Sequence, residues 1–112
     1  LGYSPAVATV LALLCTEAPR TRVVYAGTPL LAALGPRALP QGACTSPALS
    51  NLVARRLDSR LQGLASRLGY TYTRYADDLT FSSREGADQA GKILGGLRRI
   101  AKEEGFAVNE FK

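Results

Sequence analysis

The sequence contains no histidine, which removes several kinds of catalytic site from consideration. A Ser-His-Asp or Cys-His arrangement, and any zinc or haem site with histidine ligands, is excluded within this chain. The two cysteines, Cys15 and Cys44, lack the CxxC spacing of a zinc knuckle or a redox dithiol. They are expected to be ordinary thiols in a reducing cytosol. Any chemistry must therefore use carboxylates, lysine or cysteine.

Long apolar runs are also absent. The longest, near Val10 to Leu14, is far shorter than the ~20 residues that cross a bilayer. No basic-then-apolar signal segment precedes it, so we expect no membrane contact and a cytoplasmic location. An apolar fraction of 46% and a charged fraction of 21% are typical of a globular domain. The formal net charge of +5 suits a polyanionic partner but is common in unrelated proteins.

The spacing of apolar residues predicts three helices. Ser4-Pro5 is a good helix start, and the apolar residues that follow indicate a helix over about residues 5–16. A single apolar stripe predicts a long helix over residues 45–68, with Gly69 as its C-terminal stop. The stripe consists of Leu49, Val53, Leu57, Leu61, Leu64 and Leu68. A third amphipathic helix, weakened by three glycines, is expected from Ala90 to Gly105.

The remaining segments predict one sheet. Residues 18–40 are rich in proline and glycine and indicate an irregular, mobile loop with a short strand at Arg22 to Tyr25. Residues 70–82 are rich in β-formers and predict a β-hairpin with Asp77-Asp78 at its tip. Phe106 to Val108 is expected to form a returning strand. The resulting fold class is α+β, an antiparallel sheet with helices packed on one face.

The pair Asp77-Asp78 is the first candidate site. Adjacent carboxylates raise each other's pKa and destabilise a fold unless a cation neutralises them. Mg²⁺ prefers carboxylate and phosphate oxygens and is the obvious cation. For an arbitrary Asp-Asp pair a solvated turn is the commoner explanation. Here the aromatic and β-branched flanks place both charges on a rigid sheet, which favours the metal site.

Residues 39–47 form the second candidate site, a turn-rich entry to the long helix. Gly42 permits close approach of the backbone to a ligand, Thr45 or Ser46 can cap the helix, and Pro47 suits its first turn. The backbone amides here could face a phosphate or a base pair. Taken alone, such a segment is more often a loop-to-helix junction.

These two segments occur in a fixed order: QGACTSPALSN at residues 41–51, then YADD at residues 75–78, followed by LTFS. Together they resemble the palm of a reverse transcriptase of the bacterial retron type, whose pattern is QGAPTSP with a following SN, then YADD and LTFS. Cys44 stands where that family more often has proline. The segment from Gly2 to Thr16 also looks like the family segment before QGAPTSP. Gly105 to Lys112 is similar to the later motif in which a lysine closes on the nucleotide.

The resemblance implies an RNA-directed DNA polymerase that copies RNA into cDNA by two-metal nucleotidyl transfer. Because the chain begins at Leu1 without methionine, we interpret residues 1–112 as a partial palm and fingers domain. The upstream strand with a first catalytic aspartate, and the downstream thumb, are expected to be missing, so this excerpt alone is expected to be inactive. The implied partners are a structured non-coding RNA template, a DNA or RNA primer and dNTPs, with an effector protein left open. Kinship with retrons suggests phage defence.

The same resemblance assigns the catalytic residues. Asp77 would be the principal ligand of Mg²⁺ and Asp78 the supporting one. Lys112 would stabilise or protonate the departing pyrophosphate, although a terminal lysine is as readily a solvated charge.

It also assigns residues that contact the substrates. Tyr75 and Ala76 would fix the turn beside the primer end, and Gln41 and Gly42 would line the nucleotide and template pocket.

Three arginines on one edge of the long helix, Arg56, Arg60 and Arg67, form a further candidate site for a nucleic-acid backbone. A solvated helix face is the simpler explanation.

Other functions stay open at this point. One alternative is a catalytically inactive palm-like module that only binds RNA or a protein. Others are a reverse transcriptase of group II intron type and a diversity-generating one, both of which share the YxDD turn. The intact Asp77-Asp78 pair favours an enzyme, because a non-catalytic descendant has no reason to keep two repelling carboxylates. The form Thr45-Ser46-Pro47 favours the retron type.

Overall fold

A computed structural model describes residues 2–84 and 88–109 of the chain. These form an α+β protein, as the sequence predicts, but the strands make two separate two-stranded antiparallel sheets and not the single sheet expected. The chain divides into two compact units, Leu1–Ala48 and Leu49–Lys112. Each unit is described by itself. No helix among the described residues is both long and apolar enough to cross a membrane.

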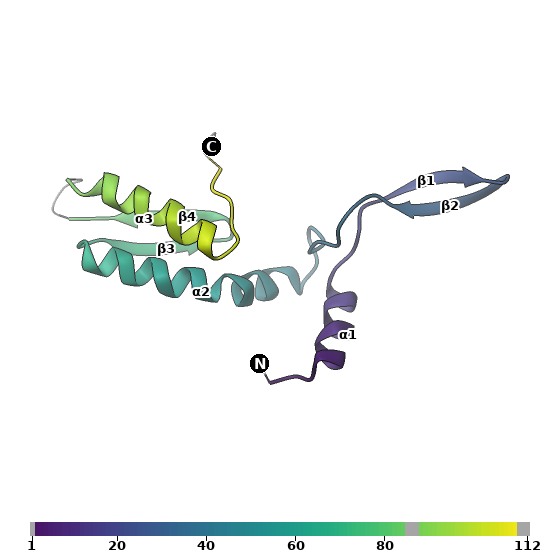
Figure 1. The fold of residues 1–112 in the computed structure, drawn as a ribbon, viewed down its shortest axis with the longest axis horizontal. Coiled ribbons are helices and arrows are strands. Elements are labelled where there is room, and N and C mark those ends of the chain that lie inside the picture. Colours follow the sequence, from purple (N-terminus) through teal and green to yellow (C-terminus); the bar gives the residue numbers. More distant parts are fainter. Residues whose placement is uncertain (1, 85–87, 110–112) are drawn as a thin grey trace. The chain divides into compact units, whose positions relative to one another are not determined.

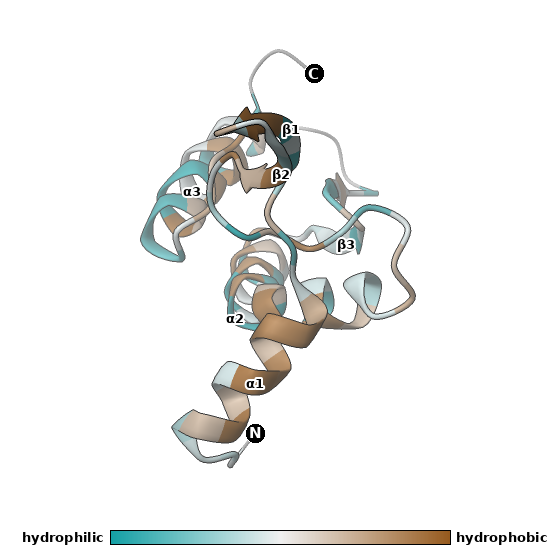
Figure 2. Cartoon of the chain, turned by 90° about the vertical axis from the view of Figure 1, so that its right-hand side faces the viewer, coloured by the Kyte–Doolittle hydropathy of each residue, from teal (hydrophilic) through white to brown (hydrophobic). Residues whose placement is uncertain are grey.

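The first unit begins with helix α1, Pro5–Cys15, as the sequence predicts. The Ser4 hydroxyl accepts a hydrogen bond from the Val7 amide at 3.4 Å, so Ser4 is the N-cap. At the other end, the Arg37 guanidinium donates to the Leu13 carbonyl at 2.7 Å. A cation at this position satisfies carbonyls that the helix leaves unpaired. No residue of α1 is buried, although Figure 2 shows that its surface is largely apolar.

The short strand predicted at Arg22 to Tyr25 is confirmed, but the prediction that the rest of residues 18–40 is an irregular loop is wrong. Strands β1, Arg20–Tyr25, and β2, Thr28–Ala33, pair antiparallel as a hairpin (Figure 1). The turn residues Ala26 and Gly27 have φ of 50° and 79°, and positive φ at both positions is the pattern of a type I′ turn. The proline in β2 argued against a strand, but a two-stranded hairpin has open edges where a missing N–H is tolerated.

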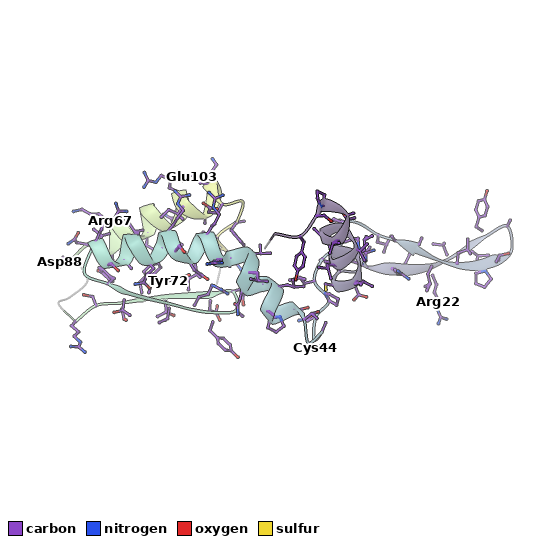
Figure 3. All side chains as sticks on the ribbon, turned by 90° about the horizontal axis from the view of Figure 1, so that it is seen from below. Arg22, Cys44, Arg67, Tyr72, Asp88 and Glu103 are labelled. Carbon is purple, nitrogen blue, oxygen red and sulfur yellow. The ribbon has the colours of Figure 1, made fainter. Side chains whose placement is uncertain are left out.

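The second unit holds most of helix α2, Ser46–Arg67, then strands β3, Thr71–Tyr75, and β4, Asp78–Ser82, and helix α3, Ala90–Glu103. Both helices and the hairpin occur where the sequence predicts them. Figure 3 shows α2 and α3 on one side of the β3-β4 hairpin, so helices cover one face of this two-stranded sheet. The predicted strand from Phe106 to Val108 does not form, since residues 106–109 lie in no strand.

Apolar residues of α2, α3 and the hairpin meet in one core. Its buried members are Leu57, Leu61, Leu64, Ala65, Tyr72, Ile93, Leu97, Ile100 and Ala101. Alternate residues of the hairpin face this core. Among them, Tyr72 and Phe81 lie opposite each other, with their ring centroids 5.2 Å apart. The predicted stripe is correct toward the C-terminal end of α2, but Val53 is 68% exposed and Ala54 is buried in its place.

Glycines end both long helices in the same geometry. Gly69 has φ of 76°, and the Tyr70 amide donates to the Ala65 carbonyl at 2.9 Å. Gly105 has φ of 81°, and the Phe106 amide makes the equivalent bond at 2.8 Å. This arrangement is the Schellman motif, in which only glycine adopts the left-handed conformation without strain. Both stops were predicted from the sequence.

The glycines inside α3 differ in their surroundings. A Cβ on Gly96 would lie 2.5 Å from the Leu64 Cδ2 atom and 3.1 Å from its Cδ1 atom, whereas a Cβ on Gly95 would meet nothing within 4 Å. Gly96 therefore lets α3 approach α2 closely.

We predict that Gly96→Ala is less stable than Gly95→Ala by roughly 1–3 kcal/mol, the usual cost of overpacking a core. Both variants gain the same helix propensity, so the difference isolates the contact with Leu64. Urea denaturation of the two variants measures it. Equal free energies of unfolding would contradict the close helix contact.

Candidate functional site

The candidate site is the end of the β3-β4 hairpin. Tyr75 pairs with Asp78 across the strands, so Ala76 and Asp77 form the two-residue turn and Asp78 is the first residue of β4. All four side chains are exposed. The structure therefore confirms the hairpin and places the consecutive residues Asp77 and Asp78 at its end, while their catalytic role stays a prediction.

Ala76 has an unusual backbone conformation. Its φ is 52°, in the left-handed region that costs a non-glycine residue roughly 1–2 kcal/mol. Such a conformation persists where the surrounding structure holds it, and strained turns are found at functional sites. The contacts that hold this turn are therefore part of the candidate site.

Arg74, which precedes the turn on β3, supplies one of these contacts. Its Nη1 atom donates to the Ala76 carbonyl at 2.9 Å. Its Nε and Nη2 atoms donate to the two carboxylate oxygens of Asp58 on α2, each at 2.8 Å. Nη2 also donates to the Asn51 side-chain oxygen at 3.0 Å. One guanidinium group thus joins the turn to two positions of α2.

Asp58 receives a third hydrogen bond, from the Tyr72 hydroxyl at 2.8 Å. Tyr72 belongs to β3 and is labelled in Figure 3. The hydrogen bond from Arg74 holds the pKa of the Asp58 carboxyl below its ordinary value, and partial burial opposes this shift. Burial raises the pKa of the Tyr72 hydroxyl, and its bond to Asp58 raises it further. Asp58 therefore stays ionised and Tyr72 stays protonated near neutral pH.

The second predicted site lies in the first unit, at the loop before α2. Gly42 has φ of 83°, and a Cβ at this position would meet nothing within 4 Å. The Ser46 hydroxyl donates to the Pro40 carbonyl at 2.7 Å and closes the loop. Gly42 is thus required by the backbone itself, and the space beside it is open. Gln41 is exposed next to it.

The predicted site residues fall in different parts of the structure. Gln41 and Gly42 belong to the first unit, and Tyr75 to Asp78 belong to the second. A shared nucleotide pocket therefore stays a prediction. Lys112 lies outside the described residues.

The three arginines of α2 have partners within the second unit. Arg60 donates to Glu104 at 2.8 Å and also pairs with Glu103, and Arg56 lies 3.4 Å from Glu104. The Arg67 Nε atom donates to a backbone carbonyl one turn earlier. These ion pairs join α2 to the end of α3, which favours a structural role. Binding of a nucleic-acid backbone by these arginines stays a prediction.

The donor chemistry of the hairpin end fits a hard divalent cation such as Mg²⁺. Asp77 and Asp78 offer carboxylate oxygens, and this cation is bound in proteins through one or two carboxylates together with substrate phosphates. Among the described residues, no three or more histidine, cysteine or acidic side chains gather into a metal-binding group. The two aspartates can therefore supply part of a coordination shell.

Sequence reasoning missed the contacts of Arg74, Asn51 and Asp58. The only local signal was that Arg74 lies two residues after Tyr72 on β3, so both side chains point to the same, inward face of the hairpin. Pairing that arginine with an acid on α2 requires knowledge of how the hairpin packs on the helix, which periodicity does not supply.

Comparison with known proteins gives one family. The family described as "Reverse transcriptase (RNA-dependent DNA polymerase)" matches residues 34–112. Retron Mx65 reverse transcriptase of Myxococcus xanthus is 51% identical over 112 residues, covering 100% of this chain and 26% of that protein. Retron Mx162 reverse transcriptase of the same organism is 46% identical over 120 residues, covering 99% of this chain and 25% of that protein.

A third relative, Retron Ec86 reverse transcriptase of Escherichia coli, is 46% identical over 74 residues, which is 66% of this chain and 23% of that protein. The chain spans about a quarter of the length of these curated relatives. No solved structure matches it at a significant level.

The ion pair at Asp58 predicts a pH dependence of stability. Because the folded pKa is lowered, the stability from this pair is present above the unfolded pKa of about 3.9 and is lost as pH falls through the folded value. We expect Asp58→Asn to cost roughly 1.5–3 kcal/mol at pH 7, and this deficit to shrink as pH falls from 5 to about 2.

Chemical denaturation over this pH range measures the deficit. Tyr72→Phe is the matched variant, because it deletes one donor to Asp58 and keeps the ion pair with Arg74. It should retain most of the pH dependence. A deficit of Asp58→Asn that is the same at every pH would contradict the ionised pair.

Proposed function

The chain belongs to the reverse transcriptase family, and from that membership we propose that it is the palm part of an RNA-directed DNA polymerase of the retron type. Two relatives named as retron reverse transcriptases are 46% and 51% identical to this chain, and the alignments cover 99% and 100% of it. This similarity supports the retron type. Residues 1–112 would be a partial palm and fingers domain, with the remaining catalytic strand and the thumb contributed by other segments.

One observation carries this proposal: Asp77 and Asp78 stand side by side at the end of a hairpin that packs on two helices. When bound, two Mg²⁺ ions would lower the pKa of a primer 3′-hydroxyl and neutralise the triphosphate of an incoming nucleotide. The hairpin's contribution is to hold two carboxylates at a fixed place, because phosphoryl transfer depends chiefly on positioning and charge stabilisation.

The neighbouring residues have supporting roles in this proposal. Ala76 has a small side chain, which leaves room for a primer end, and exposed Tyr75 offers a surface beside it. The open space at Gly42 allows a nucleotide to approach the backbone, with Gln41 next to it. Lys112 would neutralise the departing pyrophosphate.

The proposed substrates are an RNA template, a DNA or RNA primer and dNTPs. The formal net charge of +5 supports binding of a polyanion. We further propose a structured non-coding RNA as the template, an effector protein as a partner and a role in antiviral defence, all from the resemblance to retrons alone.

The first test of the proposal is Asp77→Asn in a full-length protein that contains this chain. We expect primer extension with Mg²⁺ to fall by about 1,000-fold or more, because several kcal/mol of charge stabilisation are lost. The fold should be retained, since the change relieves repulsion between neighbouring carboxylates. Asp88→Asn, an exposed acid outside the hairpin, is the matched control and should stay active. An Asp77→Asn enzyme that keeps most of its activity would exclude the metal role.

The second test separates nucleotide binding from backbone strain at Gly42. Gly27 has nearly the same φ, 79° against 83°, and the same open surroundings. Replacing either glycine by alanine should therefore cost about 1–2 kcal/mol of stability. Only Gly42→Ala is expected to raise the KM for dNTP, by about tenfold, the equivalent of ~1.4 kcal/mol of binding. Equal KM values for the two variants would show that Gly42 serves the loop alone.

The third test uses the 112 residues by themselves. We expect them to extend no primer, because two carboxylates on one hairpin cannot surround two divalent ions. Incubation with RNA template, annealed primer, dNTPs and Mg²⁺ tests this. Template-dependent extension by a preparation free of host polymerases would contradict the assignment of the metal ligands.

A further inference from the structure

Arg74 occupies a place in the second unit from which it controls the peptide group before Asp77. The Ala76 carbonyl that accepts its Nη1 bond at 2.9 Å is the carbonyl of the Ala76–Asp77 peptide bond. The side chain of Arg74 as a whole is only 10% exposed, although this bond itself lies at the exposed end of the hairpin. The orientation of that peptide group decides where the Asp77 side chain begins.

The guanidinium itself is fixed from the other side. Both oxygens of Asp58 accept from it at 2.8 Å in a bidentate pair, and Asn51 accepts at 3.0 Å. Such a pair fixes the plane of the guanidinium as well as its position. The Tyr72 hydroxyl holds Asp58 in turn. Asp58, Asn51 and Tyr72 therefore fix the direction in which the Arg74 Nη1 atom donates.

We propose that Arg74, clamped by Asp58, is a positioning residue that fixes the Ala76–Asp77 peptide group and so presents Asp77 for nucleotidyl transfer. The inference rests on the proposed function, since positioning matters only if Asp77 takes part in catalysis. Rigid α2 supplies the reference point, and the bidentate pair transmits it to a turn whose φ of 52° is otherwise unfavourable.

Lysine cannot substitute for arginine in this role. An ammonium group has no planar fork, so it cannot satisfy both Asp58 oxygens and the Ala76 carbonyl with one geometry. If Arg74 only supplied a charge, Arg74→Lys would be close to wild type. If it positions the turn, Arg74→Lys and Arg74→Gln should have similar defects.

The experiment uses a full-length protein that contains this chain, with Arg74→Lys, Arg74→Gln, Asp58→Asn and the double variant of the last two. Arg55→Gln is the matched control. Arg55 lines the same groove between α2 and β3, but the hydrogen bond to the Ala76 carbonyl comes from Arg74. Three quantities are measured: amide hydrogen exchange of residues 75–79, kcat and KM for dNTP in primer extension, and the melting temperature.

Both Arg74 variants should exchange several-fold faster at residues 75–79. Their kcat should fall by at least about tenfold, as a small displacement of a reacting group can cost up to about 100-fold, while KM for dNTP stays within about twofold. Asp58→Asn should show the same pattern more weakly, and the double variant should be no worse than Arg74→Gln, because the two side chains act as one unit. Arg55→Gln should match wild type.

Several results would overturn the inference. A lower melting temperature with wild-type exchange at residues 75–79 and wild-type kcat would make the network a packing contact only. If Arg74→Lys has wild-type kcat, Arg74 contributes only its positive charge. If KM is raised and kcat is unchanged, Arg74 acts in nucleotide binding. If the wild-type protein itself extends no primer, the proposed function fails, whereas unchanged exchange in an active protein overturns this inference alone.

Discussion

The bidentate pair between Arg74 and Asp58 is the interaction on which the rest of the second unit's site depends. The two-residue turn before Asp78 includes Ala76 in a left-handed conformation, which is unfavourable for a residue other than glycine. The hairpin is fixed by its inward face, where Tyr72 and Phe81 join the core of α2 and α3. Arg74 extends that fixed face as far as the turn, because its donors reach α2 and the Ala76 carbonyl at the same time.

The two faces of the β3-β4 hairpin have different surroundings, because successive side chains of a strand point to opposite sides. Inward positions build the core and the Arg74 network, and outward positions such as Thr73, Asp78 and Thr80 stay exposed. The outward face therefore carries Asp78 exposed to solvent, and the inward face carries the ion pair between Arg74 and Asp58 beside the apolar core. Under the proposed function, this arrangement would leave Asp78 accessible to a nucleotide, while α2 and α3 support the hairpin from its other face.

The elements of the second unit could be predicted from the sequence because local signals agree with the packing. Gly69 and Gly105 end their helices as expected, and the leucine stripe of α2 is buried from Leu57 onward. The first hairpin was missed because Pro29 counts against a strand in any local scheme, and only the pairing shows that its missing N–H is tolerated. The candidate carboxylates were found from their type and order alone. The Arg74 network was not, because a contact between residues 16 positions apart depends on how the hairpin packs on α2.

Under the proposed function, Asp77 binds a metal ion from a turn held in this geometry. A crystal structure of a full-length protein containing this chain, with RNA template, primer, a non-hydrolysable dNTP analogue and Mg²⁺, tests it most directly. We expect a carboxylate oxygen of Asp77 at the Mg²⁺ coordination distance of about 2.1 Å, with the bond from Arg74 to the Ala76 carbonyl intact. Mg²⁺ bound to the nucleotide through other residues, with Asp77 outside its coordination shell, would contradict the metal role of Asp77.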